Sequence, residues 1–447
     1  MAFRQSRLGL LPQNLNVAFM ANDQPERNLD ISVMPKVHPS IRYTFYAFIM
    51  ATPFETAYTD LVTIVGTIPL LIGIVFIGVA LLQPRICFAP PPGAFWCFAG
   101  YVFAYAIIGT TQTPMYAGPM FSRLLTLIQM LVLVWISYNL FKFPEICKGA
   151  LLAFAASCTI LSMLLIFGIS AESAKQGRTT MFADNPNSVG ITLALGLIAL
   201  LGITYGRMTV EKKLAPLAWT CVAVMGIALA MTGSRGALIG LVSGIAVLVL
   251  KEGSAGTKLK AGLIGLSVIA FLVWASYTNE AMRDRWENTW YEGDVAKRDQ
   301  IMPQAWAMFL ERPVLGWGPV SYMLELGDRT GVPKRDAHNL YLMVLIETGL
   351  LGAIPFFAGL WLSLRSAWRA RSGREGASPM AMIVCILIIN ISGQMHLRKM
   401  FWVLIAYVLA SAWSLRQVSQ HQPVRFSDTF ASRGSGTSPS PRRLQKG

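Results

Sequence analysis

Charged residues are scarce in this chain of 447 residues: Asp, Glu, Lys and Arg make up 14% of it, against roughly 25% in an average soluble domain. Hydrophobic residues make up 54%, and the mean hydropathy is +0.50. This composition excludes a soluble enzyme, a disordered chain and a coiled coil, because only a lipid solvent tolerates so much apolar surface. The composition therefore indicates a polytopic membrane protein.

Residues that bind metals are also few. The six cysteines lie in or beside apolar runs, without a CxxC pair or a Cys/His cluster, and there are four histidines. This pattern predicts no zinc site, and we expect no metal and no cofactor. A net charge of +15 would suggest nucleic acid for a soluble protein. In a membrane protein it is typical of cytoplasmic loops and of contact with anionic headgroups, so membrane lipids are the expected partner and nucleic acid is not.

Apolar runs bounded by charges or turn residues predict about twelve membrane-spanning helices, since each span needs about 20 apolar residues. The predicted spans are residues 43–57, 61–82, 93–110, 121–141, 149–169, 187–205, 214–233, 236–250, 261–277, 339–364, 379–393 and 400–415. With a cytoplasmic N-terminus, cytoplasmic segments hold 24 Lys and Arg, and short segments outside hold 5. This bias predicts that both termini are cytoplasmic.

The predicted fold is an all-α polytopic integral membrane protein with one large outer loop. Its parts are a cytoplasmic N-terminal segment (1–42), helices 1–9 (43–277), the loop (278–338), helices 10–12 (339–415) and a cytoplasmic tail (416–447). The tail is rich in Ser, Gly, Pro and Arg, which predicts disorder.

The outer loop does not look like a simple connection. It is rich in Trp and Tyr, and its 8 Lys and Arg nearly balance its 10 Asp and Glu. Apolar residues in 298–312 recur at the spacing of an amphipathic helix, which we expect to lie at the membrane surface and to end before Pro313. Loops of this size are usually functional or disordered, and this one favours function.

Ionisable side chains inside the predicted spans are candidates for function, because burying them in lipid is costly. Only Glu55, Arg123 and Glu347 qualify, and no span carries a series of Asp, Glu or His. This scarcity weakens the interpretation as an ion-coupled transporter. For Glu347, a carboxylate hydrogen-bonded to a neighbouring helix is favoured over catalysis. It follows His338 by about 900° of helix and so faces the opposite way.

Two arginines on the outer side are candidate anion ligands. Arg235 lies in the tight turn 232–236, where it is either a snorkelling interfacial side chain or a fork-shaped donor to phosphate oxygens. Arg178 lies just before the turn 184–187 and would add another positive group.

Two histidines compete for the role of a general base on that side. His338 lies where the outer loop meets the tenth predicted span; it is either a cap or interface residue or a base, since its ordinary pKa lies near operating pH. His396 lies in a short outer turn, and its neighbours Arg398 and Lys399 disfavour its protonation without giving it an obvious pocket.

Several short motifs occur in a fixed order along the chain. Residues 298–319 end in Arg-Pro-Val-Leu-Gly-Trp-Gly-Pro, residues 337–342 read Ala-His-Asn-Leu-Tyr-Leu, and residues 346–352 read Ile-Glu-Thr-Gly-Leu-Leu-Gly. Upstream stand Ser-Arg-Gly at 234–236 and Pro-Asn at 186–187. Together they resemble the signature region of the O-antigen ligase and O-antigen polymerase superfamily. The resemblance covers roughly residues 180–360, and it implies a bacterial inner-membrane glycosyltransferase of the GT-C type.

The resemblance implies a metal-independent, inverting enzyme whose active site and large loop are periplasmic. A ligase takes a glycan from undecaprenyl diphosphate and passes it to a hydroxyl of lipid A-core in lipopolysaccharide biosynthesis. The alternative is a polymerase that joins carrier-linked repeat units of O-antigen or exopolysaccharide. The chain has no DxD motif, in agreement with a donor that is not a nucleotide sugar. A lipid-linked glycan transporter and a non-catalytic scaffold are the competing classes, and the nearly charge-free spans disfavour the transporter.

The resemblance also assigns roles to residues. His338 matches the essential histidine of the family, so it is the expected catalytic residue, which orients or deprotonates the acceptor hydroxyl. Arg235 and Arg298 match the arginines that bind the diphosphate of the donor. Arg178 is a further candidate for the same role.

Overall fold

The computed structural model describes residues 36–55, 64–111, 114–169, 171–174, 177–182, 184–205, 212–250, 255–293, 297–373 and 375–413. The chain divides into two units, Met1–Val37 and His38–Gly447, and every element described below belongs to the second. The predicted tail (416–447) and most of the predicted N-terminal segment lie outside the described residues, so the expectations for them stay predictions.

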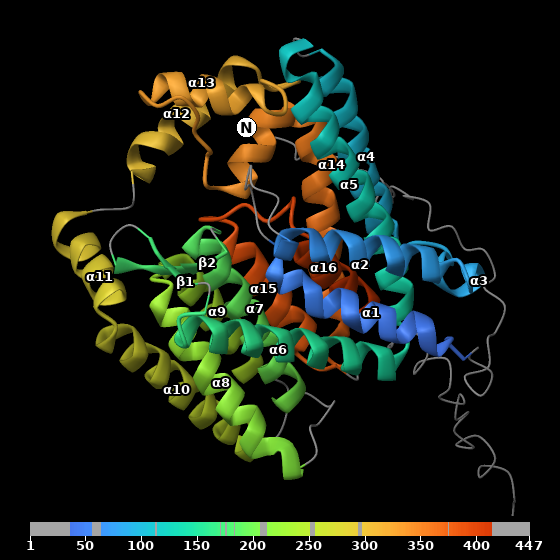
Figure 1. Ribbon diagram of the computed structural model, residues 1–447, viewed down its shortest axis with the longest axis vertical. Coiled ribbons are helices and arrows are strands. Elements are labelled where there is room, and N and C mark those ends of the chain that lie inside the picture. Colours follow the sequence, from blue (N-terminus) through green and yellow to red (C-terminus); the bar gives the residue numbers. More distant parts are fainter. Residues whose placement is uncertain are drawn as a thin grey trace, which may run out of the picture. The chain divides into compact units, whose positions relative to one another are not determined.

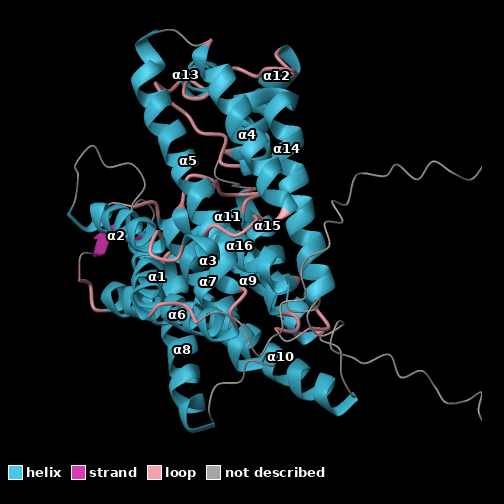
Figure 2. Cartoon of the chain, turned by 90° about the vertical axis from the view of Figure 1, so that its right-hand side faces the viewer, coloured by secondary structure: helices cyan, strands magenta, loops and turns pink. Residues whose placement is uncertain are grey.

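The described residues are mostly helical (Figures 1 and 2). In chain order the α-helices are α1 (Pro39–Ala51), α2 (Ile64–Ala80), α3 (Pro84–Cys87), α4 (Gly93–Thr110), α5 (Pro114–Phe141), α6 (Pro144–Ile166), α7 (Pro186–Tyr205), α8 (Ala215–Met231), α9 (Arg235–Val249), α10 (Ala255–Thr278), α11 (Glu280–Glu292), α12 (Arg298–Glu311), α13 (Ser321–Arg329), α14 (Leu340–Ala370), α15 (Ser378–Ile389) and α16 (Lys399–Ser411). Two short 3₁₀ turns, Thr52–Phe54 and Lys212–Leu214, follow α1 and precede α8.

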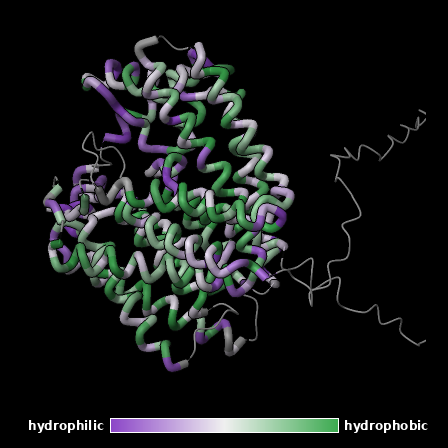
Figure 3. The backbone as a smooth tube through the Cα atoms, turned by 45° about the vertical axis from the view of Figure 1, so that its right-hand side comes forward, coloured by the Kyte–Doolittle hydropathy of each residue, from purple (hydrophilic) through white to green (hydrophobic). Residues whose placement is uncertain are grey.

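Within the described residues, six helices are long and apolar enough to cross a membrane: Gly93–Thr110, Tyr116–Phe141, Pro144–Ile166, Pro186–Thr204, Lys258–Thr278 and Leu340–Ala370. Five shorter apolar helices accompany them, and hydrophobic residues follow the helices through the fold (Figure 3). The prediction of a polytopic, helical membrane protein is therefore confirmed. The number of about twelve spans and the sidedness of the loops stay predictions.

The core forms where helices distant in sequence pack together. α14 packs along α4, α16 along α5, and α15 along α9. Aromatic rings fill the first of these contacts: the ring centroids of Phe98 and Phe356 lie 6.0 Å apart, and those of Tyr101 and Phe356 lie 4.9 Å apart. A Cβ on Gly359 would lie 2.6 Å from the Phe98 ring, so glycine is needed here for the close approach of α4 and α14.

The predicted outer loop is itself largely helical. α12 matches the amphipathic helix predicted for 298–312, and it ends at Glu311, before Pro313. Its buried residues include Ile301, Ala305 and Met308, so one face of it packs on the protein. α11 contacts α10, and α12 contacts both α13 and α14 (Figure 1). Whether α12 also lies at a membrane surface stays a prediction.

One element was not expected in an all-α fold. The strands β1 (Ala171–Ser173) and β2 (Thr179–Met181) pair antiparallel between α6 and α7 (Figure 1), with Glu172 opposite Thr180. Three-residue strands are too short to show the period-2 pattern that a sequence prediction relies on. This hairpin places Arg178 immediately before β2, close to the start of α7.

α14 is broken at Gly349, whose φ of 56° and ψ of −161° are not helical. Four backbone hydrogen bonds join the break to residues 313–318. They run from Trp317 N to Ile346 O (2.7 Å), from Gly318 N to Glu347 O (3.1 Å), from Leu350 N to Pro313 O (2.8 Å) and from Leu351 N to Val314 O (3.1 Å). Polar backbone groups that are freed inside an apolar helix need such partners. The two segments therefore provide hydrogen-bond partners for each other's backbone groups.

The glycines of both segments make this interlock possible. A Cβ on Gly316 would lie 2.5 Å from Ile346 O, and one on Gly349 would lie 2.3 Å from Val314 O. Residues 313–318 and 346–351 belong to two of the motifs that carry the family resemblance, and their backbones therefore position each other. The interlock fixes the first half of α14, at whose start His338 stands.

Candidate active site

A cavity of about 590 Å³ lies among segments that are far apart in sequence. Its lining includes Arg123 on α5, Asn187 at the start of α7, His338 before α14, and residues 392–398 between α15 and α16. Its volume is typical of a pocket that encloses a small ligand or part of a larger one. Many of the lining groups are polar, which is unusual in so apolar a chain and points to a polar ligand.

His338 stands at the wall of this cavity in a constrained conformation. Its φ is 49°, a region that residues other than glycine rarely adopt and that is often found at functional sites. Leu340 N donates to Asn390 O at 3.0 Å, which ties the start of α14 to the end of α15. The helix cap is Asn339, whose Oδ1 accepts from Leu342 N at 3.0 Å. The capping role that the sequence left open for His338 is therefore taken by its neighbour.

Burial and the surrounding charges together set the protonation of His338. Burial lowers the pKa of His338 below its ordinary value; Asp336 acts to raise that pKa, whereas Arg298 and Arg335 act to lower it. The imidazole is therefore neutral at neutral pH and keeps one ring nitrogen that can accept a hydrogen bond or a proton.

Four arginines gather beside this wall: Arg178, Arg235, Arg285 and Arg298. Burial lowers the pKa of Arg178 to about 9, with repulsion from Arg285 and Arg235 adding to the shift. Burial, followed by repulsion from Arg235, also lowers the pKa of Arg298. Arg178 therefore lies close enough to Arg235 and Arg285 for repulsion, and Arg298 lies close enough to Arg235. An anion between these groups would relieve that repulsion.

Neutral oxygen atoms hold these guanidinium groups in place. The bonds run from Arg178 Nε to Thr232 O (2.9 Å), from Arg178 Nη2 to Asn187 Oδ1 (2.7 Å), from Arg235 Nη1 to Arg285 O (2.7 Å), from Arg285 Nη1 to Gly233 O (3.0 Å) and from Arg298 Nη2 to Ser392 O (3.1 Å). The turn before α9 is central to this arrangement. Gly233 has a φ of 60°, and a Cβ there would meet Arg178 Cγ at 3.2 Å.

The arginine cluster adjoins the cavity. Asn187 and Ser392, which accept hydrogen bonds from Arg178 and Arg298, both line it. The influence of Arg298 on the pKa of His338 shows that the cluster and the histidine are neighbours. The structure thus brings together all four predicted site residues, although only His338 lines the cavity itself.

Arg285 was missed by the sequence interpretation. It lies on α11 in the predicted outer loop, and 9% of it is exposed. The signal was its spacing, because Arg285 follows the apolar residues Ala281 and Met282 by four and three positions and so shares their buried face. Because it is a charged residue on the buried face of an amphipathic helix, Arg285 could have been named as a candidate site residue from the sequence.

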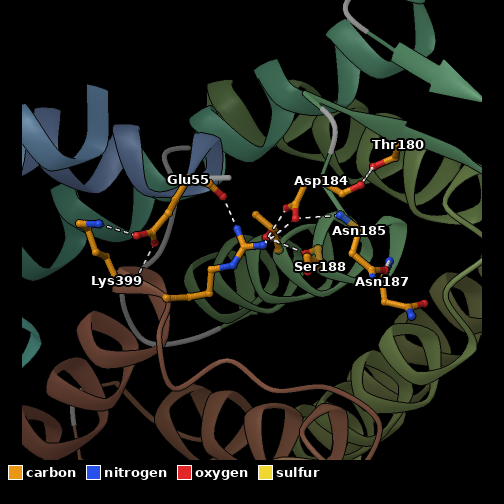
Figure 4. Close-up of polar contacts among 9 residues, drawn as sticks. Glu55, Thr180, Asp184, Asn185, Asn187, Ser188 and Lys399 are labelled. Atoms are coloured by element: carbon orange, nitrogen blue, oxygen red, sulfur yellow. Dashed lines mark hydrogen bonds and ion pairs between the residues drawn. The ribbon is translucent and has the colours of Figure 1, made fainter. Parts of the chain in front are cut away.

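The expectation that His396 has no obvious pocket was wrong, because His396 lines the same cavity as His338. The positive neighbours that argued against it are both engaged by carboxylates. Arg398 Nη2 donates to both carboxylate oxygens of Asp184, at 2.7 and 2.8 Å, and Lys399 forms an ion pair with Glu55 (Figure 4). These two pairs leave His396 beside neutralised charges rather than beside free cations.

Charges within the predicted spans are paired as well. Arg123 Nη1 on α5 lies 3.6 Å from Glu347 Oε1 on α14, and 1% of the Glu347 side chain is exposed. The expected link between Glu347 and a neighbouring helix thus exists as an ion pair rather than a hydrogen bond. Arg123 also lines the cavity, so this pair connects α14 to the site.

The fold and the site define a polytopic helical membrane protein with a buried cationic cluster beside a polar cavity. Residues 220–357 match the family model of the O-antigen ligases, which supports the resemblance to the O-antigen ligase and polymerase superfamily over that part of the chain. The matched range includes Arg235, Arg285, Arg298 and His338, whereas Arg178 lies outside it. A comparison with curated proteins finds no match.

Proposed function

We propose that the protein transfers a glycan from undecaprenyl diphosphate to a hydroxyl of lipid A-core, as an O-antigen ligase at the periplasmic face of the bacterial inner membrane. The observation that carries this proposal is the cluster of four arginines beside His338 at a polar cavity. The cluster suits a diphosphate, and the cavity suits the sugar and acceptor that meet there. The family match supports glycosyltransferase-like chemistry of this general kind.

In the proposed reaction, the acceptor hydroxyl oxygen attacks the anomeric carbon of the donor sugar. A new carbon–oxygen bond forms as the bond from that carbon to the diphosphate oxygen breaks, and lipid diphosphate leaves with the electron pair. The hydroxyl proton passes to His338. A single displacement of this kind inverts the anomeric configuration, and no metal takes part in the proposed step.

The arginines act on the charge that develops as the diphosphate departs. Preorganised donors in a site of low dielectric stabilise such charge strongly, and they need no rearrangement during the reaction. Donor binding would also affect His338, because a diphosphate beside Arg298 offsets the positive charge that lowers the pKa of His338. Binding of the donor would thus raise the pKa of His338 and make it a stronger base.

Replacing either Arg235 or Arg298 by alanine is expected to reduce glycan transfer at least about 100-fold, since loss of one preorganised donor to a developing oxyanion commonly has that effect. Transfer is measured with purified protein in nanodiscs, after its folding is checked by size-exclusion chromatography. The matched control is Arg329→Gln, because Arg329 pairs with Glu311 and Glu325 outside the cluster. Wild-type transfer by either alanine variant would remove that arginine from the proposed mechanism.

A deletion strain tests the proposed function as a whole. Accumulation of long carrier-linked glycan together with bare lipid A-core is expected for a ligase. Single repeat units on the carrier, or core capped by one repeat, would indicate a polymerase instead. If both pools match wild type in a strain without a redundant gene, glycan transfer is not the function. The envelope glycan is compared on gels, and the carrier-linked pool is measured by mass spectrometry.

A further inference from the structure

Two polar side chains between α15 and α16 line the cavity without a use in the proposed reaction. His396 is 3% exposed, and within the described part of the chain neither of its ring nitrogens has a hydrogen-bond partner. The same holds for the buried Oε1 atom of Gln394. Buried polar atoms without partners are costly and therefore rare in native proteins. Two of them on one short segment at a cavity wall point to a polar ligand.

The fold holds this segment by other groups. Asn390 Oδ1 accepts from Met395 N at 3.1 Å, and Trp402 Nε1 donates to His396 O at 2.5 Å. Arg398 anchors the end of the segment on Asp184. Because the backbone is positioned by these contacts, the imidazole of His396 and the Oε1 atom of Gln394 contribute none of the hydrogen bonds that hold it. Their polar atoms are left for the cavity.

The chemistry of these two groups selects a neutral ligand. Burial, with a smaller contribution from Arg123, lowers the pKa of His396 to about 3, so its ring is uncharged with one nitrogen donating and one accepting. The amide of Gln394 likewise donates and accepts. Phosphate accepts hydrogen bonds only and favours cations, whereas a sugar hydroxyl both donates and accepts. The methionines Met343, Met395 and Met400, which also line the cavity, would suit the apolar C–H faces of a sugar ring.

We propose that Gln394 and His396 form a hydroxyl-binding subsite that holds a sugar ring in the cavity, separate from the arginine cluster and from His338. The identity of that sugar, as part of the transferred glycan or of the acceptor, rests on the proposed function. The two histidines have different charged surroundings, since Arg123 acts on His396 and Arg298, Arg335 and Asp336 act on His338. His396 is thus a residue for sugar recognition, and His338 is the residue for proton transfer.

The test uses the full-length protein in nanodiscs with His396→Phe and Gln394→Met, which keep side-chain volume and remove the hydrogen-bonding atoms. The control is Thr126→Val, because Thr126 lines the cavity but its hydroxyl already donates to Ser122 O at 3.0 Å. Two probes are compared: farnesyl diphosphate, which has a lipid and a diphosphate but no sugar, and carrier-linked glycan extracted from host membranes. The KM for the acceptor is measured at saturating donor.

Each hydroxyl-binding variant is expected to lose about 10-fold in one sugar-dependent quantity, the loss typical of one to two neutral hydrogen bonds, while binding of farnesyl diphosphate stays unchanged. Weaker binding of carrier-linked glycan would place a donor sugar in the subsite, and a raised KM alone would place an acceptor sugar there. Effects no larger than those of Thr126→Val, or an equal loss for both probes, would overturn the subsite. Failure of wild-type protein to bind farnesyl diphosphate would count against the proposed function instead, and the glycan probe would still decide the subsite.

Discussion

Replacing His338 by alanine is expected to reduce glycan transfer at least about 100-fold, the range typical of a positioned general base, while leaving the affinity for farnesyl diphosphate unchanged. The reason is the division of roles in the proposed reaction: there the arginine cluster binds the diphosphate, whereas the neutral imidazole at the cavity wall receives the proton. Transfer and binding are measured on the same nanodisc preparation. His421→Ala, a change in the predicted tail, is the histidine control. Transfer at the wild-type rate by His338→Ala would eliminate His338 as the base.

The pH dependence of kcat/KM distinguishes a histidine that takes up the proton from one that only positions the acceptor hydroxyl. A base acts in its neutral form, so activity falls as the pH drops below its pKa. Arg335→Gln removes a charge that lowers the pKa of His338, and it should move this acid limb to higher pH. Asp336→Asn removes a charge that raises that pKa, and it should move the limb to lower pH. If the limb stays in place in both variants, His338 is not the group that titrates.

The helices were largely predictable because a span has a minimum length set by the lipid. Their ends were less predictable, and α5 shows why. The predicted span started at residue 121, whereas the helix starts at Pro114 and carries Arg123 well inside it. A charge near a helix end usually marks the water interface, but Arg123 is paired with Glu347 of α14. The sequence holds no sign of a partner more than 200 residues away.

The residues of the candidate site were likewise predictable only in part. Arg235, Arg298 and His338 were predictable because each belongs to a short motif with a recognisable order along the chain. Arg285 has no motif, and its place in the cluster depends on the contact of α11 with the turn at Gly233. His396 was set aside because its neighbours in sequence are positive, yet Asp184 and Glu55 offset those charges from other parts of the fold. The local sequence shows which residues are charged, whereas only the folded structure shows which opposite charges lie beside them.

The interlock at the break of α14 explains a further part of the family signature. Glycines at 316, 318 and 349 and the residues between them supply backbone contacts, and the side chain of Trp317 adds a hydrogen bond from Nε1 to Met308 O at 2.8 Å. These positions therefore join α12, the following turn and α14 into one support for His338. A motif can thus mark an active site without touching substrate.

Replacing Gly349 by alanine is accordingly expected to prevent stable folding. The new Cβ would lie 2.3 Å from Val314 O and 2.4 Å from Val314 C, both backbone atoms that cannot rotate away, and the residue would keep a conformation open essentially only to glycine. The matched control is Gly331→Ala, which shares a positive φ of 70° but has open space around its Cβ, and should cost only about 1 kcal/mol. The yield of monodisperse protein and its melting temperature measure both. A Gly349→Ala protein as stable as Gly331→Ala would show that the break in α14 tolerates a side chain, and that the two motifs do not depend on each other for the position of His338.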